Sequence, residues 1–346
     1  MKDNRTEISG QTKRRATIRD VAREAGVSHQ TVSRVINNSN ELSPITRQRV
    51  LDAIKKLNFR PSRTARNLAM QRTMTVGLLV PNIANPYFAE VAHGAQEVAR
   101  ASHYSVFLGN TNWDPQEEIL LLQSLASYPV DGIILCSARS SDEELAAFCD
   151  NFRPVVLGGR IFAHCNASLV RSAHDAGMRL VIRHLKQQGH TRIAMLAGPA
   201  VAPTMSNALR LNEFRCAMQE ERLPLHDAWI CHGPLTTDGG YRSALHLLAT
   251  APAVTAICAH NDLMAIGALK ACREMGRRVP DDCAVIGYND TDLAAMVDPP
   301  LTSVRVDTFE VGRQQMRRLL NMIAQPDQTF PELILPVTKL VQRRSG

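Results

Sequence analysis

Three side chains near the N-terminus have the chemistry to recognise the edges of DNA bases. His29, Gln30 and Arg34 lie in a segment whose valines would share the opposite face of a helix. A glutamine amide can pair with adenine through two hydrogen bonds, and an arginine guanidinium can pair with guanine in the same way. A solvated helix face without a partner has the same composition. The elements around these residues therefore decide between the two interpretations.

A second group of polar residues follows apolar runs in the body of the chain. It comprises the segments 81–88, 260–262 and 287–290. Their amides, carboxylates and aromatic rings suit a neutral hydroxylated ligand, because polar groups fix hydroxyls while a ring packs on the apolar face of a sugar. Asparagine and aspartate after a strand also cap helices, so both roles stay open for Asn261 and Asp262.

The motifs of common enzyme classes are missing. The sequence contains no G-x-G-x-x-G after an apolar run, no G-x-x-x-x-G-K-[ST], no G-x-S-x-G and no H-E-x-x-H. His184 and His190 lack the spacing of metal ligands. We therefore expect no catalytic site, no cofactor and no metal.

The cysteines match no zinc module and contain no C-x-x-C pair. They are Cys136, Cys149, Cys165, Cys216, Cys231, Cys258, Cys272 and Cys283. We expect reduced thiols that pack as small hydrophobic side chains.

Two short helices must position the base-recognising side chains. Thr17 and Asp20 form a capping pattern at the start of the first helix, and Gly26 ends it. Ser28 can cap a second helix that runs to about Asn37. Two short helices joined by a glycine turn are typical of a helix-turn-helix, whose second helix enters the major groove. The candidate DNA contacts of this motif are Thr17, Ser28, His29, Gln30, Thr31, Ser33, Arg34 and Asn37.

A third helix is predicted to begin after the Ser43 cap with Pro44 in its first position. Its predicted inner face consists of Ile45, Val50, Ile54 and Leu57. Near its start, three side chains are placed to contact phosphate: Thr46, Arg47 and Arg49. The following stretch, residues 63–70, is too short to be a stable helix alone, which favours a hinge that folds only when docked.

Charge is distributed unevenly along the 346 residues. Residues 1–72 contain 16 lysines and arginines against 6 acids, a net charge of +10, whereas residues 73–346 carry a net charge of −3. A basic segment on a near-neutral body is typical of a module that binds a polyanion, although a merely solubilising basic face is the alternative. No export signal and no membrane-spanning run are visible, so we expect a cytoplasmic protein without a membrane partner.

The body alternates between apolar runs and helical stretches. The runs are 76–80, 105–108, 132–135, 155–157, 192–196, 255–259 and 283–286. Helical patterns such as 86–101 and 175–188 separate most of them. This alternation predicts parallel sheets covered by helices on both faces, with ligands beyond the carboxyl ends of the strands.

The sequence resembles the lactose-repressor/galactose-repressor family of bacterial transcriptional regulators. The resemblance begins with TIRDVAREAGVSHQTVSRVINN and LSPITRQRVLDAIKKLNFRPSRTARNL. It continues with VPNIANPYFAEVAHGAQEVA, VDGIIL, HLKQQGHTRIAMLAGP, HNDLMAIGALKACREMGRRVPDD, VIGYND and PPLTSVRVD. It implies an all-α helix-turn-helix headpiece and an α/β periplasmic-binding-protein-like core of two doubly wound parallel-sheet lobes, crossed three times by the chain.

The resemblance also implies a domain order. We expect a disordered tail at 1–15, the helix-turn-helix domain at 16–62, a hinge at 63–74 and the core at 75–346. The first lobe would contain about 75–172 and 307–335, and the second about 173–304 and 336–346. In this family the hinge helices of two subunits pair in the minor groove and wedge a leucine between base steps. Ala65 and Leu68 occupy those hinge positions here.

An effector is expected in the cleft between the lobes. The candidate effector-binding residues are Tyr87, Phe88, Arg160, Arg210, Asn261 and Asn289. Several positions depart from the family pattern by losing an acid or a glycine: Gly159, Ala173-His174, Glu213 and Asn289. Lost acids beside a retained arginine make the pocket less negative, because an amide is uncharged and accepts hydroxyls less strongly than aspartate does. This favours a sugar acid or sugar phosphate, and a neutral sugar stays equally open.

We therefore expect a repressor of carbohydrate uptake or catabolism genes that binds a pseudo-palindromic operator as a homodimer or higher oligomer. An activator or a corepressor-dependent regulator is the alternative. A solute-binding protein shares the two-lobed body but has an export signal and lacks a helix-turn-helix. A regulator whose pocket takes a partner protein is a further alternative.

Overall fold

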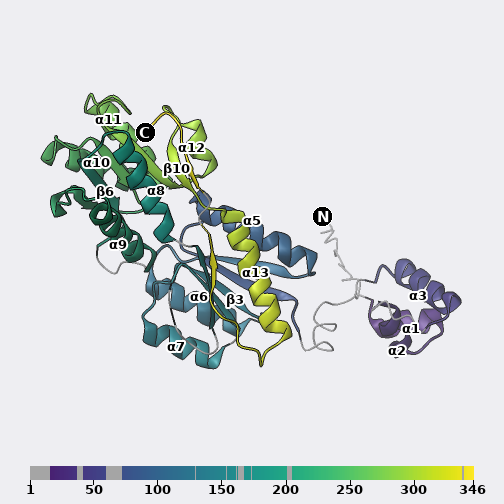
Figure 1. Cartoon of the computed structure of the whole chain (residues 1–346). Helices are drawn as coiled ribbons and strands as arrows, with labels where there is room; N and C mark the ends of the chain where they lie inside the picture. Colours follow the sequence, from purple (N-terminus) through teal and green to yellow (C-terminus); the bar gives the residue numbers. More distant parts are fainter. Residues whose placement is uncertain are drawn as a thin grey trace, which may run out of the picture. The chain divides into compact units, whose positions relative to one another are not determined.

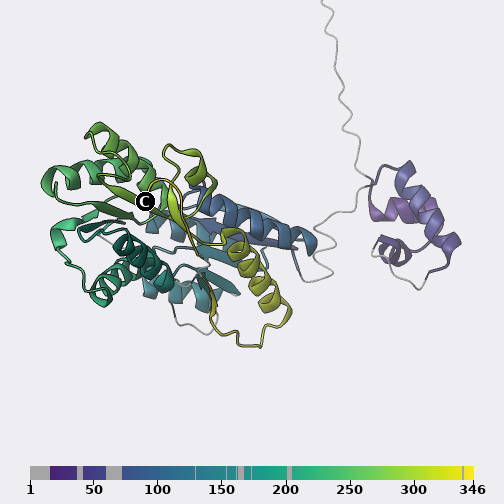
Figure 2. The same cartoon turned by 45° about the horizontal axis from the view of Figure 1, so that its top comes forward.

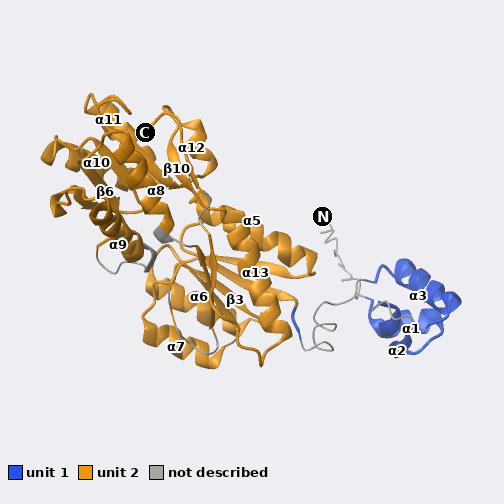
Figure 3. Ribbon diagram, in the orientation of Figure 1, with its two compact units in different colours: residues 1–73 blue, residues 74–346 orange. Residues whose placement is uncertain are grey.

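The computed structural model consists of two compact units, Met1–Thr73 and Met74–Gly346 (Figure 3). It describes residues 16–36, 42–59, 72–336 and 339–346, except for 129, 153, 161, 163–166, 173 and 201–204. The two units are described one at a time.

The first unit contains three helices, α1 (Ile18–Ala25), α2 (His29–Ile36) and α3 (Pro44–Lys56). The predicted caps are confirmed. The Thr17 hydroxyl accepts from the Asp20 amide in a capping box, and Gly26 ends α1 with a φ of 63°. The Ser43 hydroxyl accepts from the Thr46 amide at the start of α3. The sequence therefore sets the helix boundaries by local hydrogen bonds.

The core of this unit lies where the three helices meet. Val21, Val32 and Val50 are completely buried there. Ile45, however, is 74% exposed, so its predicted place on the inner face of α3 is wrong. Ile45 lies five residues before Val50, which places it about 140° around the helix from the buried stripe, and Ala53 is buried in that stripe instead.

Two parallel sheets form the second unit, and Figures 1 and 2 show helices packed around them. The first sheet has the order β11-β5-β4-β3-β1-β2. Its strands are β1 (Thr75–Val80), β2 (Ser105–Asn110), β3 (Ile133–Cys136), β4 (Val155–Gly158), β5 (Ala167–Ser172) and β11 (Leu333–Leu335). The helices of this lobe are α5 (Pro86–Ala101), α6 (Pro115–Ser127), α7 (Asp142–Asn151) and α13 (Thr308–Ala324).

The second sheet has the order β12-β10-β9-β8-β6-β7, and only the pairing of β12 with β10 is antiparallel. Its strands are β6 (Ile193–Ala197), β7 (Ile230–His232), β8 (Ala256–Ala259), β9 (Ala284–Asn289), β10 (Thr302–Arg305) and β12 (Lys339–Val341). The helices are α8 (His174–Gln187), α9 (Met205–Glu220), α10 (Thr237–Thr250), α11 (Asp262–Glu274) and α12 (Asp292–Met296), with a 3-10 turn at Asp227–Trp229.

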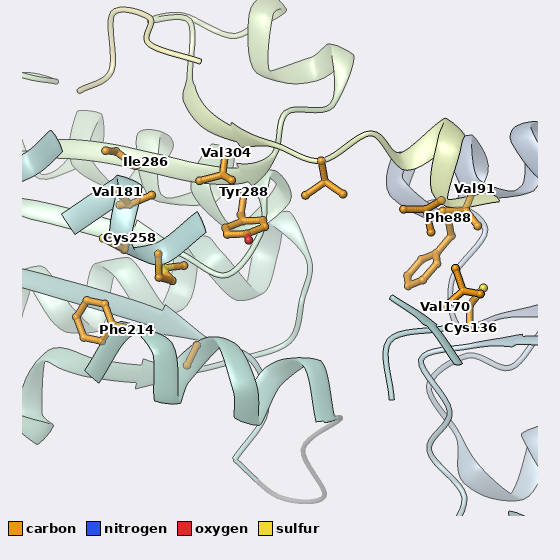
Figure 4. Packing of buried hydrophobic residues seen from close by; sticks show 14 of the residues in the cluster. Phe88, Val91, Cys136, Val170, Val181, Phe214, Cys258, Ile286, Tyr288 and Val304 are labelled. Atoms are coloured by element: carbon orange, nitrogen blue, oxygen red, sulfur yellow. The ribbon is translucent and has the colours of Figure 1, made fainter. Parts of the chain in front are cut away.

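The chain passes between the two sheets three times, after β5, after β10 and after β11. As a result α13, from near the C-terminus, lies beside α5 in the first lobe (Figures 1 and 2). The two lobes share one hydrophobic cluster. Figure 4 shows Phe88 and Val91 of the first lobe together with Val304 and Tyr288 of the second. This arrangement brings the carboxyl ends of both sheets to the region where the lobes meet.

Glycines allow the closest helix pairs to touch backbone to backbone. A Cβ on Gly94 of α5 would overlap the carbonyl oxygen of Phe309, and one on Gly312 of α13 would overlap that of Val91. The helices α10 and α11 are also in close backbone contact at glycines, because Cβ atoms on Gly240 or Gly267 would overlap the facing backbone. Each lobe is therefore built around one helix pair that has no room for a side chain at the crossing.

None of the helices within the described residues is long and apolar enough to cross a membrane. The described cysteines are free thiols, and all of them except Cys216 are buried.

Candidate functional site

The exposed face of α2 presents the predicted base-recognising side chains. His29, Gln30 and Arg34 are exposed, while Val32 and Val35 are buried on the opposite face. The Ser28 hydroxyl accepts from the Thr31 amide at 3.1 Å, which caps α2 at its N-terminus. The structure thus exposes all three candidates on α2, with His29 and Gln30 in its first turn and Arg34 in its last turn.

The other headpiece candidates divide between capping and surface positions. Thr31 and Ser33 are half-buried on α2, and so are Thr46 and Arg47 at the start of α3. The Thr17 hydroxyl donates to the Asp20 carboxylate at 2.7 Å. Asn37, Ala65 and Leu68 lie outside the described residues.

Arg49 has a structural contact besides its predicted one with phosphate. One guanidinium nitrogen donates to the Ala25 carbonyl at 2.6 Å, which ties α3 to the C-terminal end of α1. Basic side chains near a helix C-terminus stabilise its last carbonyls. Phosphate contact by Arg49 stays a prediction.

A pocket lies where the two lobes of the second unit meet. The volume between its walls is about 690 Å³, including the part that opens to solvent. Tyr87, Phe88, Arg210, Asn261 and Asn289 all line it, so the structure brings five of the six predicted effector residues together. A concave site with a few converging polar groups between apolar and aromatic walls is the usual form of a small-molecule pocket.

Aromatic rings form the first-lobe wall. The rings of Tyr87 and Phe88 meet edge to face at 5.0 Å, and Phe88 meets Trp113 at 5.8 Å. The Asn85 side chain accepts from the Tyr87 amide at 3.1 Å and caps α5, which fixes this wall at a helix start. Burial raises the pKa of Tyr87, so its phenol keeps its proton and can donate a hydrogen bond.

The second-lobe wall is built around Arg210 of α9. This side chain is 4% exposed, lies 3.7 Å from the centre of the Tyr288 ring and donates to the carbonyl of His260. Stacking on an aromatic face holds the guanidinium in one plane. Asn289, at the end of β9, is buried with a φ of 108°, a conformation that favours short polar residues and glycine.

The open question about Asn261 is answered in favour of a cap that also lines the pocket. Its side-chain oxygen accepts from the Met264 amide at 2.9 Å, and its amide nitrogen donates to the Leu235 carbonyl at 3.4 Å. The capping bond occupies one lone pair of the oxygen. Asn261 is therefore fixed in orientation where it faces the pocket.

Arg160 is not among the residues that line the pocket. Its guanidinium donates to the Ser140 carbonyl and pairs with Asp142, although the neighbouring Gly159 does line the pocket. The arginine holds the turn after β4 to the start of α7.

The sequence interpretation missed the first-lobe floor of the pocket. Gln315 of α13 is 2% exposed, and its side chain lies against Gly158 and 3.6 Å from the Cys136 thiol. Burial raises the pKa of Cys136 to about 12, so it stays a thiol. One signal was available, because Gln315 interrupts the apolar stripe of Val311 and Leu319 at four-residue spacing.

Asp262 has a structural role outside the pocket lining. Its buried carboxylate accepts from the Thr291 amide at 2.7 Å, from the Thr291 hydroxyl at 3.0 Å and from the Ser303 hydroxyl at 2.5 Å. These bonds tie the start of α11 to the loop after β9 and to β10. Burial raises the pKa of Asp262 from 3.8 to about 6, and the hydrogen bonds offset part of that rise.

This pKa makes the stability of the core depend on pH. Because the pKa is higher in the folded state, the folded protein binds the proton more tightly. The contribution of protonated Asp262 to the unfolding free energy is therefore complete below pH 3.8, and it is lost as the pH rises through about 6. The expected loss is about 1.4 kcal/mol of unfolding free energy between pH 5 and pH 7.5. Chemical denaturation of the wild type and of Asp262→Asn at both pH values checks this, since the variant lacks the titrating group. An equal pH dependence in both proteins would contradict it.

Comparison with protein-family models matches two parts of the chain. Residues 17–62 match the model described as bacterial regulatory proteins, lacI family. Residues 182–346 match the periplasmic binding protein-like domain. The first match covers the three helices of the headpiece, and the second covers most of the second lobe and the C-terminal segments.

Relatives match over nearly the whole chain. Catabolite control protein A of Priestia megaterium is 35% identical over 303 residues, which covers 88% of this chain and 91% of that protein. The HTH-type transcriptional repressor PurR of Mannheimia succiniciproducens is 35% identical and covers 92% and 97%.

Solved structures match the fold over the same length. The Lac repressor dimer bound to operator and the anti-inducer ONPF has a TM-score of 0.85 at 28% identity, and covers 96% of this chain and 99% of that one. The complex of the transcriptional regulator CelR with cellobiose has a TM-score of 0.73 at 35% identity, and covers 96% and 100%.

Proposed function

The chain belongs to the LacI family of bacterial regulatory proteins, and we propose that it represses carbohydrate uptake or catabolism genes under the control of a small-molecule effector. As a member of this family it is a DNA-binding transcriptional regulator and not an enzyme. A regulator of chromosomal genes acts in the cytoplasm.

One observation carries the proposal. The same chain contains a capped recognition helix with an exposed row of His29, Gln30 and Arg34, and a core pocket lined from two lobes. A solute-binding protein has the second feature without the first. The two features together suit a protein whose DNA binding responds to a ligand.

The DNA target is a pseudo-palindromic operator bound by a homodimer. The Lac repressor relative binds its operator as a dimer, which supports the same assembly for this chain. Two-fold protein symmetry is matched by inverted half-sites in DNA. The proposed DNA contacts are Thr17, Ser28, His29, Gln30, Thr31, Ser33, Arg34, Asn37, Thr46, Arg47, Ala65 and Leu68.

The effector occupies the pocket between the lobes. The proposed contacts are Tyr87, Phe88, Arg210, Asn261 and Asn289, with Arg160 acting through the adjacent Gly159 turn. The CelR relative holds cellobiose, which supports a carbohydrate-like ligand. A ligand that binds the two lobe arrangements unequally shifts their populations, and the hinge at 63–74 passes this change to the headpieces. Release of DNA on binding is the proposed outcome, and corepression is the alternative.

Titration of the intact protein against a palindromic duplex from the region upstream of its gene tests the proposal. We expect tight binding to this duplex and much weaker binding to a scrambled duplex of the same composition. Equal affinity for both duplexes would overturn the proposed function.

Salt dependence gives an independent prediction. The headpiece neutralises DNA phosphates, and each neutralised phosphate releases its condensed counterions. Each one adds about −0.9 to the slope of the logarithm of the binding constant against the logarithm of the salt concentration. For about four neutralised phosphates, affinity for either duplex falls by about tenfold between 0.1 M and 0.2 M salt. Anisotropy titrations at several salt concentrations measure the slope, and a flat response would exclude phosphate contacts by the basic segment.

A further inference from the structure

The last residues of β5 reach the pocket beyond the strand's pairing with β4. That pairing ends at Leu157 and Leu169. Residues 170–172 follow, and all three line the pocket. On the other side of the strand, Ser172 pairs with Leu335 of β11. The first lobe therefore presents the end of β5 to the pocket, immediately before the chain crosses to the second lobe.

One face of β5 carries Ser168, Val170 and Ser172, because side chains alternate along a strand. All three are buried, and α13 packs against this strand. The helix supplies a partner for the first serine, since the Arg318 guanidinium donates to the Ser168 hydroxyl at 2.8 Å. At the pocket, α13 presents Val311 instead. An apolar side chain offers no bond to the second serine.

The Ser172 hydroxyl is buried without a hydrogen bond. The residue is 3% exposed, and its side-chain oxygen has no partner among the residues that the structure describes. Such a hydroxyl is costly, because it gives up its bonds to water and gains none from the protein. Folded proteins keep few groups of this kind, and each calls for an explanation. A ligand in the pocket can supply the missing bond.

The first-lobe side of the pocket has a second polar side chain, Gln315. Its oxygen accepts from the Cys136 thiol at 3.6 Å, so its nitrogen, which lies against Gly158, is the group left to donate. The apolar side chains of Val170 and Val311 line the same part of the pocket. Hydrogen-bonding groups beside apolar surface suit a carbohydrate, which carries hydroxyls on a C–H framework.

We propose that Ser172 binds a hydroxyl group of a carbohydrate effector, with the Gln315 amide as a second polar contact. This inference rests on the proposed function of the pocket as the effector site. A sugar hydroxyl suits the serine because both groups can donate and accept. The bond forms only when the ligand is present. The serine therefore adds to the affinity for the ligand at a cost to the stability of the ligand-free protein.

Unfolding of the ligand-free protein gives the first test. Ser172→Ala is expected to keep or raise the midpoint of thermal unfolding, because it removes a buried hydroxyl that has no bond to lose. Ser168→Ala, on the same face of β5, is the matched control. It removes the acceptor of the Arg318 bond and is expected to lower the midpoint by about 2–4 °C. A comparable fall in Ser172→Ala would overturn the inference, since the hydroxyl would then stabilise the fold.

Isothermal titration of the intact protein gives the second test. The probes are cellobiose, ribose, glucuronate and ribose 5-phosphate, which present hydroxyls on neutral and on acidic sugars. We expect at least one of them to bind the wild type. Ser172→Ala is expected to weaken that probe by about 3- to 10-fold, which corresponds to the loss of one neutral hydrogen bond. Ser168→Ala is expected to change its affinity by less than about twofold, because this serine lies outside the pocket lining.

Two results of the titrations would overturn the inference. They are no binding by any of the four probes, and equal affinity of the wild type and Ser172→Ala for the probe that binds. Operator binding is measured on the same preparations. Either result beside intact operator binding rejects only the role of Ser172, whereas loss of operator preference in the wild type rejects the proposed function.

Discussion

Gly94→Val is expected to lower the unfolding free energy of the core by about 3–5 kcal/mol. A Cβ at this position overlaps the carbonyl oxygen of Phe309 and lies 3.2 Å from the Arg313 nitrogen. Backbone cannot swing aside as a flexible side chain can, so α5 and α13 must separate and leave voids along their contact. Gly312→Val is expected to have a similar effect, because its Cβ would lie 2.9 Å from the Ala95 nitrogen.

Denaturant unfolding followed by circular dichroism measures this loss. Ala147→Val is the matched control, since Ala147 is exposed on α7 in the same lobe and tests the cost of a β-branched residue alone. That cost is below about 1 kcal/mol. If Gly94→Val and Ala147→Val prove equally stable, the close crossing of α5 and α13 does not exist in solution.

Arg34→Ala is expected to remove most of the preference for the cognate base at its position in the operator. A bidentate contact with a base is worth about 1–3 kcal/mol, and a dimer carries the substitution twice, so the expected cost is about 2–6 kcal/mol. Gln30→Ala is expected to act in the same way at a different base pair. Binding to random DNA falls much less, because phosphate contacts dominate it.

Competition titrations with operators altered at one base pair at a time measure this discrimination. The control is Arg23→Ala on α1, whose side chain is exposed and lies 3.7 Å from the Asp20 carboxylate. We expect that variant to keep its base preferences, since it removes the same charge away from α2. Full discrimination in both Arg34→Ala and Gln30→Ala would place the base contacts outside α2.

Helices and strands were predicted correctly from the sequence where local interactions determine them. Thr17, Gly26 and Ser43 set helix ends by short-range hydrogen bonds and a left-handed turn, and the structure confirms all three. Each of the seven apolar runs corresponds to a strand. Six of these strands are buried along nearly their whole length, which requires a continuous apolar segment, whereas β2 at the edge of its sheet is exposed or half-buried throughout. The two-lobed parallel architecture follows from their alternation with helices.

The strands that were missed are short or have polar residues on a buried face. In β5, Ser168 and Ser172 are buried beside Val170. In β10, Thr302 and Ser303 are completely buried, because Ser345 and Asp262 satisfy their polar groups. These partners are about 40 residues away in sequence, so no local pattern could reveal them. The short strands β7, β11 and β12 carry too few residues to show a period.

The pocket was predictable on the side formed by loops that follow strands. Tyr87, Arg210 and Asn289 lie at such positions, or on the helix that the family pattern indicates. The interrupted apolar stripe marks Gln315 as a buried polar residue but does not place it at the pocket, because the chain returns to the first lobe only after β10 of the second sheet. Arg160 is the opposite case, because it was predicted to line the pocket and does not. It follows the lining residue Gly159 in the sequence, but its side chain pairs with Asp142.

Selection of binding sites from a pool of random duplexes, performed with the intact protein at moderate salt, tests most directly whether α2 reads DNA. We expect the selected pool to converge on two half-sites in inverted orientation, bound about 10³-fold or more tightly than the starting pool. A pool that gains no inverted repeat, with or without the sugar acids and phosphates present, would contradict a sequence-specific regulator.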